Sequence, residues 1–214
     1  MGPWRRAWLA GLACVSAAVL GPASAQSVST LPAPTVAAIT AAIPYPRAGA
    51  PHPDVVIVEY LDYNCPYCRK SAPELHKLLA TDPGVQVLYK EWPIFGGVSV
   101  YAARAALAAN WQGKFLVAHD ALIGATHDLD HDSDVDGVLR AAGLDMARLD
   151  VDRRTHAAQI DAILARSAQE THALGLQGTP VFLLGRDLVP SALDLHALQR
   201  LIARVRTERR SASR

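Results

Sequence analysis

The chain has 214 residues, of which 50% are hydrophobic and 19% are charged, so it can bury a core and lacks the composition of a disordered protein. Its length predicts one domain with room for an insertion. Lys and Arg number 21 against 20 Asp and Glu, and this balance argues against a nucleic-acid-binding protein, which needs a strongly basic surface. Three cysteines are too few for a disulfide-stapled miniprotein or a multi-cysteine zinc module.

Residues 1–25 have the three parts of a secretory signal peptide. Arg5 and Arg6 supply a positive start, an apolar run follows, and Ala23-Ser24-Ala25 is a cleavage site of the A-x-A type. The alternatives are an uncleaved membrane anchor and lipidation of Cys14. The apolar run is short for an anchor, and no later stretch is long and apolar enough to span a bilayer. We therefore expect an exported protein, located in the periplasm.

Residues 26–53 form an arm rich in Pro, Ala and Ser, which we interpret as a linker or an extended segment. Residues 54–97 then have the pattern of one strand–helix–strand unit. A continuous β-branched run at 55–61 is typical of a strand buried on both faces, and 85–92 alternates like a second strand. Between them, apolar residues recur at helical spacing from about Cys65 to Ala80.

A long helical block separates this unit from the rest of the chain. We assign residues 98–174 to a helical insertion, because Ala-rich and amphipathic segments follow one another there. Residues 175–206 return to strand and helix, with a strand at Val181 to Leu184, a hairpin partner after a turn, and a helix that runs to about Val205. Residues 207–214 form a basic tail.

The segment Cys65-Pro66-Tyr67-Cys68 follows the first buried strand and opens the predicted helix. At a helix N-terminus, unpaired backbone N–H groups and the helix dipole favour an anion, so the thiol pKa of Cys65 should fall below the free value of roughly 8.5. Cys68 lies one turn further into the helix and can resolve a mixed disulfide. Pro66 suits the first turn because its missing N–H has no helical partner there.

Two further features fit a redox-active pair of cysteines. Glu59 lies in the buried strand ahead of Cys65, where burial raises the pKa of a carboxyl and lets it exchange a proton with the resolving thiol. Thr179-Pro180 precedes the late strand, and a cis bond there would place backbone beside the sulfurs. Lys90 either faces Glu59 from the neighbouring strand or is an ordinary surface lysine.

These residues resemble the thioredoxin superfamily, and within it the DsbA-like thiol–disulfide oxidoreductases of the ScsC-like periplasmic branch. The resemblance rests on VVIVEYLDYNCPYC (residues 55–68), KEWPIFG (residues 90–96), AARAALAA with QGKF, and the late GTPVF, and it covers roughly residues 43–205. It implies an α/β thioredoxin fold, in which a central mixed β-sheet is flanked by helices and an all-helical domain is inserted before the cis-proline strand.

The resemblance also implies a role for each residue of the site. Within Cys65-Pro66-Tyr67-Cys68, the first cysteine would be the nucleophile, the last would resolve the mixed disulfide, and Pro66 and Tyr67 would tune the redox potential. Thr179 and Pro180 would pair with the backbone of a substrate. Glu59 would be the buried acid of the family. No metal and no cofactor are implied.

The implied partners are cysteine-containing exported proteins and a membrane redox partner that resets the C-x-x-C pair. Nucleic acid is not expected. ScsC-like proteins carry a longer N-terminal segment that forms trimers, whereas only residues 26–53 precede the first strand here, so we favour a monomer. We predict a periplasmic oxidase, and the alternatives are a disulfide reductase or isomerase and a thioredoxin-fold Cu(I)-binding protein.

Three other interpretations stay open, namely a structural disulfide, a metal site at the cysteines and a calcium loop elsewhere in the chain. An inert structural disulfide would stabilise little, because cysteines three apart close a small loop. Two thiolates could bind Cu(I), or Zn(II) with His76 as the nearest further ligand. Residues 132–137 match the start of a calcium loop, but Gly143 stands where its last carboxylate should be, and the same acids also suit a helix start.

Overall fold

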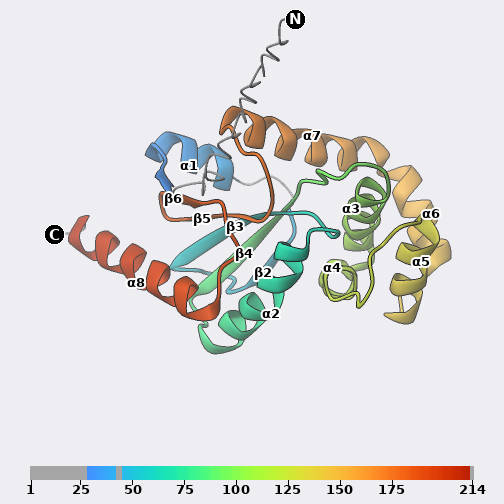
Figure 1. Ribbon diagram of the computed structural model, residues 1–214, viewed down its shortest axis with the longest axis horizontal. Helices are drawn as coiled ribbons and strands as arrows, with labels where there is room; N and C mark the ends of the chain where they lie inside the picture. Colours follow the sequence, from blue (N-terminus) through green and yellow to red (C-terminus); the bar gives the residue numbers. More distant parts are fainter. Residues whose placement is uncertain (1–27, 42–44, 213–214) are drawn as a thin grey trace, which may run out of the picture.

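The structure, a computed structural model, describes residues 28–41 and 45–212, so the expected signal peptide lies outside the described residues. A mixed β-sheet forms its centre (Figure 1). The strands in chain order are β1 (Ser29–Thr30), β2 (Arg47–Gly49), β3 (Val55–Leu61), β4 (Val85–Glu91), β5 (Val181–Leu184) and β6 (Asp187–Val189). Across the sheet they lie in the order β1-β6-β5-β3-β4-β2.

The middle of the sheet is the β3–β4 pair. The two strands are parallel, with Glu59 opposite Tyr89 and Leu61 opposite Glu91, and helix α2 (Pro66–Thr81) connects them. Six of the seven residues of β3 and all seven of β4 are buried, which explains why both strands are dominated by apolar residues. Because the strands are parallel, both end at the edge of the sheet where α2 begins.

Helices cover both faces of the sheet (Figure 1). The helices α2 and α8 (Leu195–Ala212) lie on one face, and α1 (Ala33–Thr40) and α7 (Ala157–Ala173) lie on the other. A further group stands beside the sheet and consists of α3 (Gly97–Ala109), a 3-10 turn (Asn110–Gln112), α4 (Phe115–Ile123), α5 (Asp132–Ala141) and α6 (Met146–Thr155). This group and α7 separate β4 from β5 in the chain, so the α/β class with a helical insertion is confirmed.

The Pro-rich arm is part of the sheet and not a free linker. Its first strand, β1, pairs with β6 at one edge, and its second, β2, pairs with β4 at the other. Arg166 of α7 holds α1 by donating a hydrogen bond to the backbone oxygen of Ala38 at 3.0 Å. Strands of two and three residues are too short to produce an alternating pattern, so no periodicity in the sequence marks them.

Two helices differ from their expected extent. The last helix, α8, continues to Ala212, well beyond the end expected near Val205. Arg206 anchors this extension through ion pairs of 2.7 Å to Asp54 and 2.8 Å to Asp82, which lie at the start of β3 and the end of α2. The sequence predicts one helix from Met146 to Leu174, but the structure has two, α6 and α7, which meet at His156.

A buried ion pair lies on the α7 face of the sheet. Lys90 is opposite Tyr60, so its side chain points away from the face that carries Glu59. The Lys90 side chain is fully buried, and its Nζ lies 2.5 Å from Oε2 of Glu170. The Tyr60 hydroxyl donates to the same oxygen at 2.8 Å, and Arg166 Nε donates to Oε1 at 2.9 Å. Both expectations for Lys90 are therefore wrong, since it neither faces Glu59 nor lies on the surface.

Replacing Glu170 with Gln should destabilise the fold by about 3 kcal/mol, because it leaves the buried charge of Lys90 without a counter-charge. Adding Lys90→Met should recover most of that loss, since no unpaired buried charge remains. Arg166→Gln is the control, because its side chain is 39% exposed and its ion pair should contribute less than about 1 kcal/mol. Urea unfolding measures all three variants, and equal losses for Glu170→Gln and Arg166→Gln would contradict this account.

Candidate active site

The two cysteines lie at the start of α2, directly after β3 and a short turn. Cys65 is the N-cap residue, Pro66 follows at the first helical position, and Cys68 lies within the first turn. Both cysteines are free, and both are buried, with 3% exposure for Cys65 and 0% for Cys68. Pro66 and Tyr67 between them are exposed. The first turn therefore presents the Cys65 sulfur at the helix end and holds Cys68 behind it.

Cys65 is the acidic member of the pair. Its surroundings lower the pKa of its thiol to about 6. The largest cause is a hydrogen bond from the side chain of Cys68, and the backbone N–H groups of Cys68 and Tyr67 act in the same direction. Partial burial opposes them. At neutral pH, Cys65 is therefore a thiolate stabilised by donors at the helix start.

Cys68 has the opposite character. Burial raises the pKa of its thiol far above the ordinary value, and its hydrogen bond to Cys65 and the negative charge of Glu59 raise it further. A thiol with a high pKa is a poor leaving group as a thiolate. Cys68 therefore needs a proton whenever a Cys65–Cys68 disulfide opens.

Glu59 lies in the middle of the sheet, on the face that α2 covers. Its side chain is buried in β3, and burial raises the pKa of its carboxyl to about 8. The negative charges of Glu91 and Cys65 contribute to the same rise. The negative charge of Glu59 in turn raises the pKa of Cys68, and both groups are buried, where charges act on each other more strongly than in water. Their protonation states are therefore coupled.

The structure adds buried polar groups that the sequence analysis missed. Glu91 is fully buried on the same face as Glu59, and its Oε1 lies 3.5 Å from the hydroxyl of Tyr63. That hydroxyl also lies 3.2 Å from Nδ1 of His119, whose ring is 4.3 Å from the ring of Tyr89. The available signal was the pair Lys90-Glu91, since two charged residues end a strand that is otherwise largely apolar.

The loop before β5 lies beside Cys65. The Thr179–Pro180 peptide bond is cis, and Sγ of Cys65 lies 3.1 Å from the backbone oxygen of Thr179. The next residue, Val181, is opposite Tyr60 in β3, so the antiparallel pairing of β5 brings this loop to the edge of the sheet where β3 ends. Segments more than a hundred residues apart thus meet at the sulfur.

Asp62 joins the loops around the cysteines. Its carboxylate is buried and accepts hydrogen bonds from the backbone of Asn64 at 2.8 Å, from the Ser99 hydroxyl at 2.8 Å and from the backbone of Phe95 at 3.2 Å. These donors come from the turn before α2, from α3 and from the loop after β4. The side chains of Ile94 and Phe95 in the loop after β4 are exposed to solvent, and so is that of Tyr67 in the first turn of α2.

The alternative metal sites find little support in the described residues. Among residues 28–41 and 45–212, no group of three or more His, Cys, Asp or Glu side chains is placed to hold a metal ion. His76 pairs with Asp120 at 3.0 Å on the surface. In the calcium-like segment, Asp134 caps α5 by accepting a hydrogen bond from the backbone of His131 at 2.9 Å. That segment is therefore the start of a helix.

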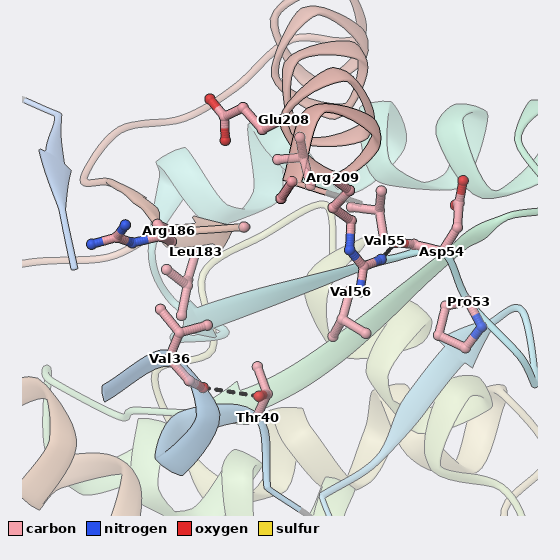
Figure 2. A pocket seen from close by; sticks show the side chains of 13 residues that line it. Val36, Thr40, Pro53, Asp54, Val55, Val56, Leu183, Arg186, Glu208 and Arg209 are labelled. Atoms are coloured by element: carbon pink, nitrogen blue, oxygen red, sulfur yellow. Dashed lines mark hydrogen bonds between the residues drawn. The ribbon is translucent and has the colours of Figure 1, made fainter. Parts of the chain in front are cut away.

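A pocket of about 510 Å³ lies at the other end of β3 (Figure 2). Val36 of α1, Val56 of β3 and Leu183 of β5 line it, together with Arg209 of α8. Val56 stands near the start of β3, whereas Cys65 follows its end. The pocket is therefore separate from the cysteine site.

The helices of the described residues include none that is long and apolar enough to cross a membrane.

Solved structures of similar fold include several redox proteins. The chain is similar to a thioredoxin-like oxidoreductase from Silicibacter pomeroyi DSS-3, with 40% identity, a TM-score of 0.72, and coverage of 76% of this chain and 92% of that one. It is similar to the thiol-disulfide exchange protein alpha-DsbA2 from Wolbachia pipientis (25%, TM-score 0.71, coverage 75% and 87%). It is also similar to the catalytic domain of Proteus mirabilis ScsC (27%, TM-score 0.70, coverage 81% and 95%).

Among curated proteins, the chain is 33% identical over 138 residues to the Na(+)/H(+) antiporter NhaA 1 of Mycobacterium sp. (strain KMS), an alignment that covers 63% of this chain. The chain spans only 22% of the length of that antiporter. A sequence profile of the DSBA-like thioredoxin domain matches residues 56–203, which is well over half of the chain. The predicted resemblance and fold are therefore confirmed, and the chain belongs to the family of DSBA-like thioredoxin domains.

Proposed function

We propose that the protein is a thiol–disulfide oxidoreductase that oxidises cysteines of other exported proteins through Cys65 and Cys68. The observation that carries this proposal is the opposite acidity of the two sulfurs. The thiol pKa of Cys65 is lowered to about 6, whereas that of Cys68 is raised. A difference in pKa between the two thiols plays no part in an inert structural disulfide. A thiol–disulfide exchange reaction, in contrast, needs one stable thiolate and one thiol that stays protonated.

In the oxidising direction, a substrate thiolate attacks the Cys65 sulfur of the Cys65–Cys68 disulfide. A bond forms between the substrate sulfur and Cys65, and the bond to Cys68 breaks. Cys68 leaves with the electron pair and takes a proton, for which Glu59 is the candidate donor because it is buried and its charge acts on the Cys68 thiol. A second substrate thiolate then attacks the substrate sulfur of the mixed disulfide, so that the substrate is oxidised and Cys65 leaves as its stable thiolate.

The acidity of Cys65 favours this direction. Stabilising the thiolate stabilises the reduced protein relative to the disulfide, so the disulfide becomes a stronger oxidant. The donors that do this are fixed in the first turn of α2. No cofactor takes part in this scheme, because the two sulfurs carry both electrons.

The surroundings of Cys65 suit an extended protein segment as substrate. The loop at Thr179 and Pro180 brings backbone to the sulfur, and a substrate chain can pair with it there. The exposed Tyr67 and Phe95 offer apolar contacts nearby. We assign Pro66 and Tyr67 the tuning of the redox potential, because they lie between the two sulfurs in the first turn.

The place of action follows from the first 25 residues and from the chemistry. A signal peptide sends the protein to the periplasm, where disulfides persist. An oxidase ends each cycle reduced, so a membrane redox partner has to reoxidise the Cys65–Cys68 pair. By the domain limits proposed from the sequence, the cysteines belong to residues 54–97 and the cis-proline loop belongs to residues 175–206. Both segments of the site come from one chain, so a monomer is sufficient for the reaction.

The thiolate of the reduced protein should titrate near pH 6, and Cys68 should stay protonated throughout the neutral range. Absorbance at 240 nm against pH measures this. Cys68→Ala should raise the Cys65 pKa by about one unit, because it removes the strongest hydrogen bond to the sulfur, whereas Cys68→Ser keeps a donor and should shift it less. Equal shifts in the two variants would contradict the role of that hydrogen bond.

Incubation of the oxidised protein with a reduced two-cysteine peptide tests the reaction itself. The wild type should oxidise one equivalent of peptide, and Cys65→Ser should oxidise none because it lacks the attacked sulfur. Cys68→Ser, started from the peptide disulfide, should accumulate a mixed disulfide through Cys65 that is visible on a non-reducing gel. Turnover by Cys65→Ser would refute the proposal, and a stoichiometric Cu(I) complex without any turnover would favour the copper-binding alternative.

The reduction potential of the Cys65–Cys68 pair decides whether the protein oxidises its substrates or reduces them. Equilibration of residues 26–214 in glutathione buffers should give a value near that of DsbA, roughly −120 mV, because the reduced form is stabilised. A value near that of thioredoxin, roughly −270 mV, would show a pair that is kept reduced and would assign the protein to the reductases or isomerases.

A further inference from the structure

Glu91 is a second buried acid beside Glu59. In the parallel β3–β4 pair, Glu59 is opposite Tyr89 and Leu61 is opposite Glu91, so the two carboxyls lie on the same face of the sheet, one side-chain position apart. Glu91 is fully buried. Its Oε1 accepts a hydrogen bond from Tyr63 at 3.5 Å, whereas its Oε2 has no hydrogen-bond partner among the described residues. A structural carboxylate at such depth would have a cation or several donors.

The positive charge nearest in sequence does not neutralise this pair. Lys90 is the neighbour of Glu91, but its side chain lies on the opposite face and pairs with Glu170. The acids are therefore left to interact with each other. Burial raises the pKa of each carboxyl to about 8, and the charge of Glu91 is the next largest cause of the rise at Glu59.

The two acids differ in which one ionises first. The Tyr63 hydroxyl and a backbone N–H donate to Glu91 and favour its charged form. In the part of the chain that the structure describes, no comparable donor acts on Glu59, and the charges of Glu91 and Cys65 both favour its neutral form. The first proton to leave the pair therefore leaves Glu91, and the remaining proton stays on Glu59.

The other titratable groups around Glu91 stay neutral at pH 7. His119 of α4 faces Tyr63, and burial lowers the pKa of its imidazole to about 3. The pKa values of Tyr63, Tyr89 and Tyr45 are raised, mainly by burial, and the charge of Glu91 adds to each rise. The charge that Glu91 gains when it loses its proton is therefore not compensated by any of these four groups.

We propose that Glu91 is a positioning residue that acts through Glu59: Glu91 gives up the first proton of the pair, and its negative charge then keeps the second proton on Glu59, ready for Cys68 when the disulfide opens. This inference rests on the proposed function of the cysteine pair. In the step concerned, the substrate thiolate forms a bond to Cys65, the Cys65–Cys68 bond breaks, and the electron pair goes to the Cys68 sulfur. The proton of Glu59 moves to that sulfur, which leaves Cys68 as a thiol and Glu59 as a carboxylate.

Glu91→Gln tests the proposal through the pH profile of disulfide opening. The oxidised wild type and the variant are mixed with the same small thiol, so the ratio of their rate constants removes the ionisation of that thiol. The ratio should be near one below about pH 6 and fall toward one tenth by about pH 8, because a loss of one pKa unit at Glu59 is a tenfold change in its protonated fraction. A ratio that does not change with pH would overturn the proposal.

A double substitution separates an action through Glu59 from an independent one. Glu59→Gln should slow disulfide opening and abolish the fall of the rate ratio with pH. Adding Glu91→Gln to Glu59→Gln should change neither the rate nor its pH dependence, since Glu91 has no other route to Cys68. A further loss equal to that caused by Glu91→Gln alone would show a general structural role and would overturn the proposal.

A matched pair of tyrosine variants covers the case in which Glu91→Gln does not fold. Tyr63→Phe removes a hydrogen bond that favours charged Glu91, so it should shift the pH profile in the same direction and by less than Glu91→Gln. Tyr89→Phe removes a buried hydroxyl that does not contribute a hydrogen bond to Glu91, so it should leave the profile in place. Equal shifts in both variants would contradict the proposal.

A measurement without exchange chemistry keeps this inference separate from the proposed function. In the folded, oxidised protein both acids bind protons up to about pH 8, whereas a glutamate in the unfolded chain loses its proton near pH 4.3. The folded state therefore holds more protons in this window, and the free energy of unfolding falls as the pH rises through it. Glu91→Gln should reduce that slope by one proton, and an unchanged slope would overturn the inference even if the thiol exchange is confirmed.

Discussion

The effect of the Cys68 thiol on the Cys65 sulfur, which lowers the pKa of Cys65 and raises that of Cys68, is the interaction on which the rest of the site depends. It exists because α2 begins at Cys65, which places the second sulfur in the first turn. One sulfur then receives donors while the other is buried behind it, so the same turn lowers one pKa and raises the other. Thr179 and Asp62 serve this arrangement, since they fix the loops that surround the first turn.

The pleat of the sheet separates the buried charges. Lys90 and Glu91 are consecutive, so their side chains point to opposite faces. On one face, Lys90 is neutralised by Glu170 and serves the packing of α7. On the other face, no cation of the described residues pairs with Glu91 or Glu59, which leaves both carboxyls available for the proton transfer to Cys68 that we propose. Because Lys90 pairs with Glu170, it supplies no counter-charge to Glu59 and Glu91 on the opposite face of the sheet.

Much of the fold follows from the sequence, because the central strands and most helices have a strong period of their own. The strand at 55–61, the helix after Cys65 and the strand at Val181 to Leu184 lie where their patterns predict them. The arm strands and the last turns of α8 depend instead on distant partners, namely β4, β6 and the acids that bind Arg206. Local patterns carry no information about such contacts. The same reason explains the failure at Lys90 and the missed Glu91, whose surroundings are set by α4 and α7.

The arm has a consequence for how the molecule behaves among its own copies. A sheet edge offers unpaired backbone N–H and C=O groups to any other strand. Here β1 and β2 are the outermost strands, so the arm covers the edges of β6 and β4 with strands too short to act as templates. The two short arm strands thus protect the sheet against strand pairing between copies of the protein.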